Sequence, residues 1–368
     1  MLQRDKLFKE LSRVTHSFIK DFNKAQEFAL ALWAALLAES DYHNKLETFK
    51  SSYAVPSWSG SINANNAVAL QQSPYTVISV DGSQIYPDRH QGFECYLINI
   101  GTVVIQYQAC STILLDSEPL VMLRENAEDV SPEAVNCYRS EEELKRALIL
   151  GEQFLHHKPL VLFDGSLIMW HLEGKEKTTK EYFLTRSLEI MKNFKTHNIL
   201  HAGYISMPKS KELINILRRA CEMGMGIAAE GHIGLLDLLV DTTIAHFFLT
   251  PHMRSIVFKN RSISLQEYPE ALQPYFFYIN NGYEIVRIEI PAWIAERRED
   301  VDLIARICLD QAIKGNGYPV CLREAHEQAV VKNHDREFFY QLMHRLSQQH
   351  GYAYPTSQKS LKKRSVDI

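Results

Sequence analysis

Two apolar segments of the chain lead into the same tripeptide, Asp-Gly-Ser. They read VISVDGS at residues 77–83 and LVLFDGS at residues 160–166. In each, residues able to fill a buried strand precede an aspartate, Asp81 or Asp164, which is expected to lie at the carboxyl end of that strand. Open α/β sheets form their sites at such strand ends. Glycine lets the backbone turn sharply there, and serine can bond the free amides that follow.

If the two strands are neighbours, Asp81 and Asp164 face each other across a short gap. Two carboxylates that close repel, and one takes up a proton unless a cation lies between them. Mg²⁺ and Mn²⁺ prefer oxygen ligands of this kind. Two such ions about 3.5–4 Å apart can activate water and stabilise the leaving oxygen in phosphodiester cleavage. Because Asp-Gly is also a common turn dipeptide, the pattern alone leaves both a cation site and two plain turns open.

Strand and helix patterns alternate along the rest of the chain, which is typical of the α/β class. Helices are predicted at residues 5–50, 140–156, 183–194, 211–223, 301–314 and 324–350. Strands are predicted at residues 76–80, 95–108 (one or two strands), 112–115, 160–163 and 200–205. A hairpin is predicted around Asn281-Gly282, joining residues 276–280 to 283–290. The polar stretch 51–74 is predicted to be a long loop or linker.

Composition excludes several classes of protein. The six cysteines are scattered singly without a CxxC pair, which argues against a zinc ribbon or a redox dithiol. No long uncharged apolar run and no secretory signal are present, so we expect no membrane span and a cytoplasmic location. Because the net charge is −4, binding to DNA phosphates would require local basic patches, bound metal or a partner protein.

The ordered motifs of the chain resemble those of the NurA nuclease family. The matching segments are VDGS at 80–83, FDGS at 163–166, GYIS at 203–206 followed by Lys209 and Lys211, RSIVF at 254–258, GYP at 317–319 and REAH at 323–326. The resemblance runs from about Val77 to Arg345. It implies a ribonuclease-H-like mixed sheet flanked by helices, and Mn²⁺- or Mg²⁺-dependent cleavage of DNA. It also implies a homodimer that works with a hexameric HerA-type ATPase in DNA double-strand-break repair.

The same resemblance implies roles for individual residues. Asp81 and Asp164 match metal ligands, and a third carboxylate is expected on the helix before the second strand. Glu141, Glu142 and Glu143 adjoin there. Glu143 is favoured because it shares a helix edge with small residues four and eight positions on, whereas its two neighbours suit solvated charges near a helix start.

Further residues carry weaker expectations. His326 is a candidate metal ligand or general acid, and Tyr318 a candidate contact to a phosphate or to metal-bound water. Arg323, Lys209 and Lys211 are candidate contacts to DNA phosphates. Glu118 is a weaker candidate for the third carboxylate, in an acidic stretch, 116–135, that is interpreted as an insertion. Each of these also has a plain structural interpretation as a surface charge, a helix-start histidine or turn packing.

The sequence therefore predicts four parts: an N-terminal helical segment (1–50), a linker or loop (51–74), a NurA-like nuclease domain (75–350) and a basic polar tail (351–368). Two alternatives remain. Paired strand–Asp-Gly-Ser turns also suit an actin-like or sugar-kinase-like ATP-binding phosphotransferase, with Gly224 and Gly226 as the only hint of an adenosine loop, although no P-loop motif is present. The other alternative is an inactive NurA-like partner subunit.

Overall fold

The computed structural model describes residues 2–87, 95–123, 131–225 and 233–351. The chain divides into two compact units, each built from two separate stretches. The first unit comprises residues 1–70 and 204–309, and the second comprises residues 71–203 and 310–368. Among the described helices, none combines the length and the apolar character that crossing a membrane requires.

The second unit contains a mixed sheet with the strand order β6-β5-β2-β3-β4. Its strands are β2 (Tyr75–Ile85), β3 (Cys95–Tyr107), β4 (Thr112–Leu123), β5 (Leu160–Asp164) and the first four residues of β6 (Leu200–Ile205). β3 pairs with β2 and β4 in antiparallel fashion, whereas β2 and β5 are parallel. Buried residues fill almost the whole length of β2 and β3, as expected for strands covered on both faces.

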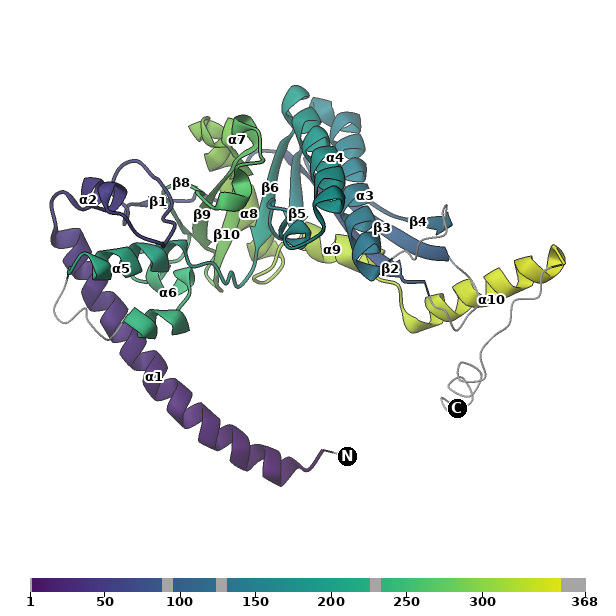
Figure 1. The fold of residues 1–368 in the computed structure, drawn as a ribbon. Coiled ribbons are helices and arrows are strands. Elements are labelled where there is room, and N and C mark those ends of the chain that lie inside the picture. The colour runs from purple at the N-terminus through teal and green to yellow at the C-terminus, as the bar shows by residue number, and fades with distance from the viewer. Residues whose placement is uncertain (1, 88–94, 124–130, 226–232, 352–368) are drawn as a thin grey trace. The chain divides into compact units, whose positions relative to one another are not determined.

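Helices cover both faces of this sheet (Figure 1). They are α3 (Pro132–Gln153), α4 (Lys177–Thr196), α9 (Val320–Ala329) and α10 (Asn333–Gln349), with short 3₁₀ turns at Leu155–His157 and Trp170–Leu172. α3 starts where the Ser131 side chain accepts a hydrogen bond from the Ala134 amide, a standard N-cap.

Two glycines mark where the helices touch the sheet. A Cβ on Gly82 of β2 would meet side-chain atoms of α3, and a Cβ on Gly101 of β3 would meet the backbone of α9. Gly101 is paired with Asp81, so it shares a face with Asp81, whereas Gly82 points to the opposite face. α3 and α9 therefore pack on opposite faces of the same strand pair.

The first unit is built around a second group of strands, in the order β1-β7-β9-β10 with β8 beside β9. These are β1 (Asn65–Ala67), β7 (Met253–Ser255), β8 (Phe258–Lys259), β9 (Pro274–Asn280) and β10 (Ile285–Pro291). The unit also contains α1 (Arg4–Ala38), α2 (Tyr42–Thr48), α5 (Glu212–Glu222), α6 (Asp241–Ala245), α7 (Ala292–Ala295), most of α8 (Arg298–Lys314), and 3₁₀ turns at Ile233–Leu238, Ile263–Leu265 and Glu270–Leu272.

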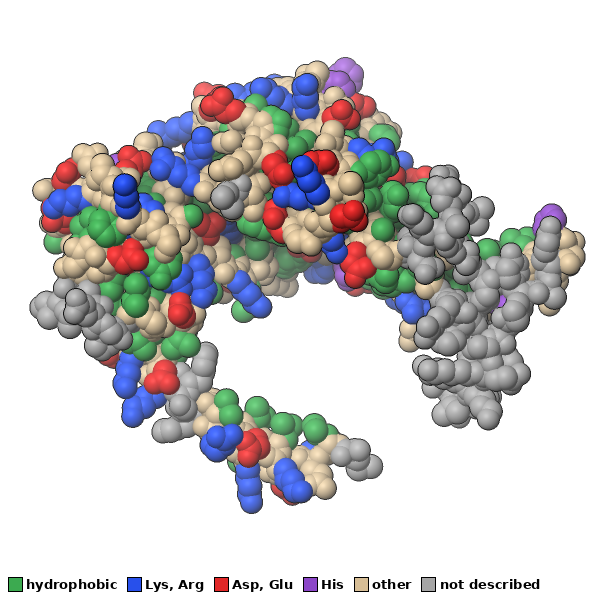
Figure 2. All heavy atoms as spheres, in the orientation of Figure 1, with side chains coloured by type: hydrophobic (Ala, Val, Ile, Leu, Met, Phe, Trp, Pro, Cys, Tyr) green, Lys and Arg blue, Asp and Glu red, His purple; other side chains and the backbone are tan. Residues whose placement is uncertain are grey.

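The two halves of α1 differ in burial. Ala25, Ala29, Leu32 and Leu36 lie in the core of the first unit. The N-terminal half exposes apolar side chains, among them Phe8, Leu11 and Val14. Hydrophobic and basic side chains lie together along this part of the helix in Figure 2.

The predicted elements are largely present, with differences in extent. The helix predicted for 5–50 is broken between α1 and α2, and the one predicted for 324–350 is broken between α9 and α10. The stretch 51–74 is only partly loop, because β1 pairs with β7 and Val55, Trp58 and Ile62 are buried. β4 continues past residue 115 to Leu123, so the first residues of the predicted insertion form a strand. The hairpin at Asn281-Gly282 is confirmed.

One expectation about the repeated tripeptide is wrong. The first Asp-Gly-Ser does not end its strand, because β2 continues to Ile85 and each tripeptide residue pairs with β3. The ladder of backbone hydrogen bonds to β3 keeps this segment extended. Only the second tripeptide follows the expected pattern, since β5 ends at Asp164 and Gly165 has φ +110°, a conformation that favours glycine.

The close approach of α9 to β3 predicts that Gly101→Ala destabilises the second unit. An added Cβ would lie 2.3 Å from the Ala329 amide nitrogen and 2.5 Å from the Ala325 carbonyl oxygen, so the helix must move. We expect a loss of about 1–3 kcal/mol in the free energy of unfolding, measured in urea. Gly234→Ala is the matched control, because its Cβ meets nothing within 4 Å. An unfolding curve for Gly101→Ala that matches this control would contradict the packing argument.

Candidate active site

The parallel pairing of β2 with β5 brings the two aspartates to the same level of the sheet. The last paired residues are Ser79 and Leu162, and the Ser79 hydroxyl also donates to the Leu162 carbonyl at 2.6 Å. Continuing this register by two residues places Asp81 beside Asp164. The hypothesis that the two strands are neighbours is therefore confirmed.

The loop after Asp164 is organised by the serine of the second tripeptide. The Ser166 hydroxyl accepts hydrogen bonds from the Ile168 amide at 3.0 Å and from the Trp170 indole at 3.2 Å. Serine bonds the amide that follows, as the sequence predicts. In contrast, Ser83 of the first tripeptide donates to the carbonyl of Ala329. The two identical tripeptides thus serve different structural purposes.

Of the three adjoining glutamates, the structure places only Glu143 at the aspartates. Its carboxylate lies 3.2 Å from the Arg139 guanidinium, and Gly82 leaves the space that it occupies. Glu142 instead pairs with Lys145. Glu141 is buried and forms a two-pronged ion pair with Arg186, so the expectation that it is a solvated charge is wrong. It links α3 to α4, which explains its burial.

α9 brings His326 to the same place. The Nδ1 atom of His326 lies 2.8 Å from Asp81 Oδ2, which fits an N–H that donates to the carboxylate. Two side chains hold the end of this helix, because Asn99 Nδ2 and the Ser83 hydroxyl both donate to the Ala329 carbonyl. These contacts satisfy a carbonyl that has no partner within the helix, and they fix the position of His326.

Tyr318 lies in the turn between α8 and α9 and contributes a hydrogen bond to Asp164. Each aspartate therefore has one partner from the C-terminal part of the chain, His326 for Asp81 and Tyr318 for Asp164. The structure brings together Asp81, Glu143, Asp164, Tyr318 and His326, all of which the sequence singled out.

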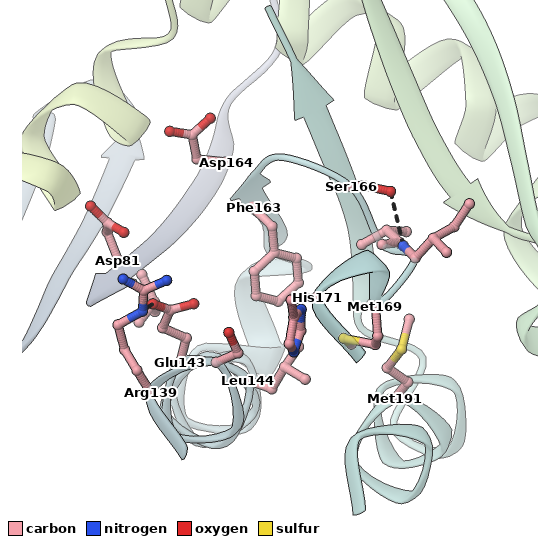
Figure 3. A pocket seen from close by; sticks show the side chains of 14 residues that line it. Asp81, Arg139, Glu143, Leu144, Phe163, Asp164, Ser166, Met169, His171 and Met191 are labelled. Carbon is pink, nitrogen blue, oxygen red and sulfur yellow. Dashed lines mark hydrogen bonds and ion pairs between the residues drawn. The ribbon is translucent and has the colours of Figure 1, made fainter. Parts of the chain in front are cut away.

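A cavity of about 200 Å³ opens between α3 and the loop that follows β5. Asp81, Glu143, Asp164 and Arg139 line one part of it, as Figure 3 shows. Leu144, Phe163, Met169 and Met191 line an apolar part. His171 also lines the cavity, and burial together with the positive charges of Arg139 and Lys175 lowers its pKa.

Burial and the proximity of other carboxylates raise the pKa of two acidic side chains in this cavity. Burial, together with the charges of Asp81 and Asp164, raises the pKa of Glu143 to about 8, against the opposing effect of Arg139. Desolvation by neighbouring protein atoms and the charge of Asp81 also raise the pKa of Asp164, although the side chain reaches solvent. Burial contributes most to both shifts, and the neighbouring negative charges, which a bound cation would neutralise, add to them.

The carboxylates have protein partners in this arrangement. Within the described residues, no three His, Cys, Asp or Glu side chains lie close enough together to hold one metal ion as they stand. Glu143 is paired with Arg139, and Asp164 is bonded by Tyr318. Binding an ion would require at least one carboxylate to exchange its present partner. The donor set itself, three carboxylates, fits a hard divalent cation.

The remaining candidates lie elsewhere. Glu118 is on β4, where it pairs with Arg146, and it does not line the cavity. Arg323 is exposed on α9 beside Glu324. Lys209 and Lys211 belong to the first unit, where Lys211 donates to the Asp237 carbonyl. Most of the basic tail, including Lys359, and Gly226 of the suggested adenosine loop lie outside the described residues.

Sequence reasoning missed residues that support the site. Gly101 and Asn99 set the position of α9, and Arg139 and His171 line the cavity. Arg139 was detectable, because it precedes Glu143 by one helical turn and i,i+4 pairs of opposite charge face each other. Nothing in the sequence signals Gly101, since its importance depends on a helix more than 200 positions later.

The fold and the site together define a mixed α/β protein with an acidic, two-strand carboxylate centre. A family model, the NurA domain, matches residues 75–331, and the chain belongs to the NurA family. The resemblance noted from the ordered motifs is thereby confirmed.

One solved structure agrees with this assignment at the level of the fold. The chain is similar to the NurA nuclease from Sulfolobus solfataricus, with 14% identity, coverage of 95% of this chain and 98% of that chain, and a TM-score of 0.56. A NurA solved with manganese has 11% identity, coverage of 90% and 96%, and a TM-score of 0.41. No curated protein matches the sequence.

The raised pKa of Glu143 predicts a pH-dependent stability. Between its usual pKa of 4.5 and about 8, the folded state holds the proton more tightly than the unfolded chain does. The free energy of unfolding should therefore fall as the pH rises from 5 to 8, with a slope of at most about 1.4 kcal/mol per pH unit. Urea unfolding in EDTA measures this slope.

Glu143→Gln should flatten the slope, whereas Glu142→Gln, on the neighbouring residue outside the cavity, should retain it. Equal slopes in the two variants would show that Glu143 carries its charge without cost in the folded protein.

Proposed function

We propose that this chain is a divalent-metal-dependent deoxyribonuclease whose active site contains Asp81, Glu143 and Asp164. Membership of the NurA family supports a nuclease. The observation that carries the proposal is the convergence of three carboxylates on one cavity, two of them with a raised pKa. Carboxylates with raised pKa values that gather in one cavity are characteristic of functional sites.

Asp81, Glu143 and Asp164 would hold Mn²⁺ or Mg²⁺. The bound ions supply positive charge that activates water and neutralises the scissile phosphate, as in other two-metal hydrolases. Asp81 and Asp164 are fixed by adjacent strands, and Glu143 approaches from α3 across Gly82. Rigid elements on two sides therefore set the donor oxygens. Arg139, released from Glu143, is suitably placed to contact a phosphate oxygen.

His326 and Tyr318 complete the site in different ways. Asp81 orients the imidazole through Nδ1, so Nε2 is the ring nitrogen that can give a proton to the leaving oxygen. The His326 side chain is 62% exposed, which allows a DNA strand to reach it. Tyr318 positions Asp164 by its hydrogen bond. We assign His326 the role of general acid and Tyr318 that of a positioning residue.

We extend the proposal to the wider setting implied by the family. The second unit is assigned a ribonuclease-H-like core, and the protein is expected to act in the cytoplasm as a homodimer with a HerA-type ATPase in DNA end resection. Arg323, Lys209 and Lys211 remain candidates for phosphate contacts. The phosphotransferase alternative is disfavoured by the family match, and an inactive subunit is disfavoured because all five candidate side chains are present.

Removing one carboxylate should abolish metal-dependent cleavage of DNA. We expect Asp81→Asn, Asp164→Asn and Glu143→Gln each to lower the cleavage rate with Mn²⁺ by at least about 100-fold, because each removes a negative charge that holds the ions. The assay follows digestion of single- and double-stranded oligonucleotides.

Glu142→Gln is the matched control and should stay near the wild-type rate. Activity that survives all three substitutions would refute the site, and metal-stimulated ATP turnover without DNA cleavage would favour the phosphotransferase.

Substitution of His326 should separate chemistry from metal binding. His326→Ala should lower the cleavage rate by roughly 10²–10⁴-fold, while Mn²⁺ should still raise the thermal unfolding midpoint as in the wild type. Loss of this thermal shift together with activity would instead identify His326 as a metal ligand. The measurement is differential scanning fluorimetry with and without Mn²⁺.

A further inference from the structure

The first unit contains a second cavity, of about 360 Å³, that is lined by arginines. It lies between β1 and one face of α8, where Arg298, Asp302 and Arg306 recur at four-residue spacing and so share one side of the helix. The charged and amide side chains that line it are Asn65, Asn66, Arg254, Arg298, Asp302 and Arg306.

The acidic side chain that lines the cavity neutralises only part of the positive charge of its arginines. Asp302 is the one acidic side chain lining the cavity, and Arg254, which is buried, holds its Oδ1 atom at 2.5 Å. Arg298 reaches the other carboxylate oxygen only at 3.7 Å, and its side chain is 82% exposed. Three guanidinium groups against one carboxylate leave the cavity with two uncompensated positive charges.

Arg306 is the most informative of these side chains. Its Nε atom is buried and makes no hydrogen bond within the described residues. A buried donor without a partner costs free energy, and in native proteins it commonly signals a missing water, ion or ligand. Arg306 itself lines the cavity, so a ligand bound there would lie beside its guanidinium group.

We propose that this cavity binds a phosphoryl group. Guanidinium groups form paired hydrogen bonds with phosphate oxygens, and a phosphate group brings a charge of up to about −2, which would balance the two uncompensated arginines. The cavity is large enough for a phosphate together with the sugar attached to it. The phosphate comes either from a DNA strand, in which case the inference rests on the proposed function, or from free phosphate or a nucleotide.

The test compares two double variants of the full-length chain. Arg298→Gln/Arg306→Gln removes the two uncompensated charges. Arg13→Gln/Arg261→Gln is the control, because it removes the same charge from two exposed residues of the first unit that pair with Glu10 and Glu47. Circular dichroism verifies that both variants fold. Arg254 is left intact because it holds Asp302.

In the first arm, binding of a labelled single-stranded oligonucleotide is measured by fluorescence anisotropy in EDTA, so that no cleavage occurs. If the phosphate comes from DNA, Arg298→Gln/Arg306→Gln should weaken binding at least about tenfold relative to the control variant. Its salt dependence should also be shallower, by about 0.7 in the log–log slope for each lost contact.

In the second arm, millimolar inorganic phosphate is added and the thermal unfolding midpoint is followed. A rise in the wild type and in the control that is absent from Arg298→Gln/Arg306→Gln identifies a site for free phosphate. Equal behaviour of the two variants in both arms would overturn the proposal. The proposal would also be overturned if polyglutamate, but not inorganic phosphate, displaced the oligonucleotide from the wild type. A wild type that binds through this cavity yet cleaves no DNA contradicts the proposed function only.

Discussion

The parallel pairing of β2 with β5 imposes the central constraint on the second unit, because it fixes two carboxylates side by side. The backbone register leaves Asp81 and Asp164 no freedom to move apart along the strands. Their repulsion must be compensated by whatever approaches the strand pair from either face. Arg139 and Glu143 approach from α3, while His326 and Tyr318 come from the C-terminal part of the chain. The packing of both helices is therefore tied to the electrostatics of one point in the sheet.

Glycine makes this approach possible from both sides. Gly82 leaves room on one face for the Glu143 carboxylate, and Gly101 lets the backbone of α9 contact β3 on the other. A side chain at either position would hold a helix away from the strand pair by roughly the thickness of a methyl group. Because hydrogen bonds and metal coordination tolerate displacements of only a few tenths of an ångström, such a shift would separate the donor groups. The glycine of the first tripeptide is thus a packing residue and not a turn residue.

The sequence could reveal the side chains of the centre but not the way they are held. Asp81 and Asp164 were identifiable from the local pattern, because each aspartate directly follows a run of residues typical of a buried strand. Glu143 was distinguishable from its neighbours only by its helix face. Gly101, Asn99 and Ser83 matter because they contact α9, which lies more than 200 residues later in the chain, and no local pattern records such a contact. The wrong prediction for β2 has the same origin, because pairing with β3 overrides the tendency of Asp-Gly to turn.

The distribution of charge over the chain explains how a protein with a small net negative charge could bind DNA. With a net charge of −4, the long-range field of the whole protein does not attract DNA, and binding has to rely on short-range contacts at points where positive charge is concentrated. Under the proposed function, the carboxylate centre would become such a point only with divalent ions bound to it. The arginine cavity of the first unit needs no metal, since its two uncompensated guanidinium groups are already positive. DNA affinity in EDTA would then reside mainly in the first unit, whereas affinity gained on adding Mn²⁺ would reside in the second.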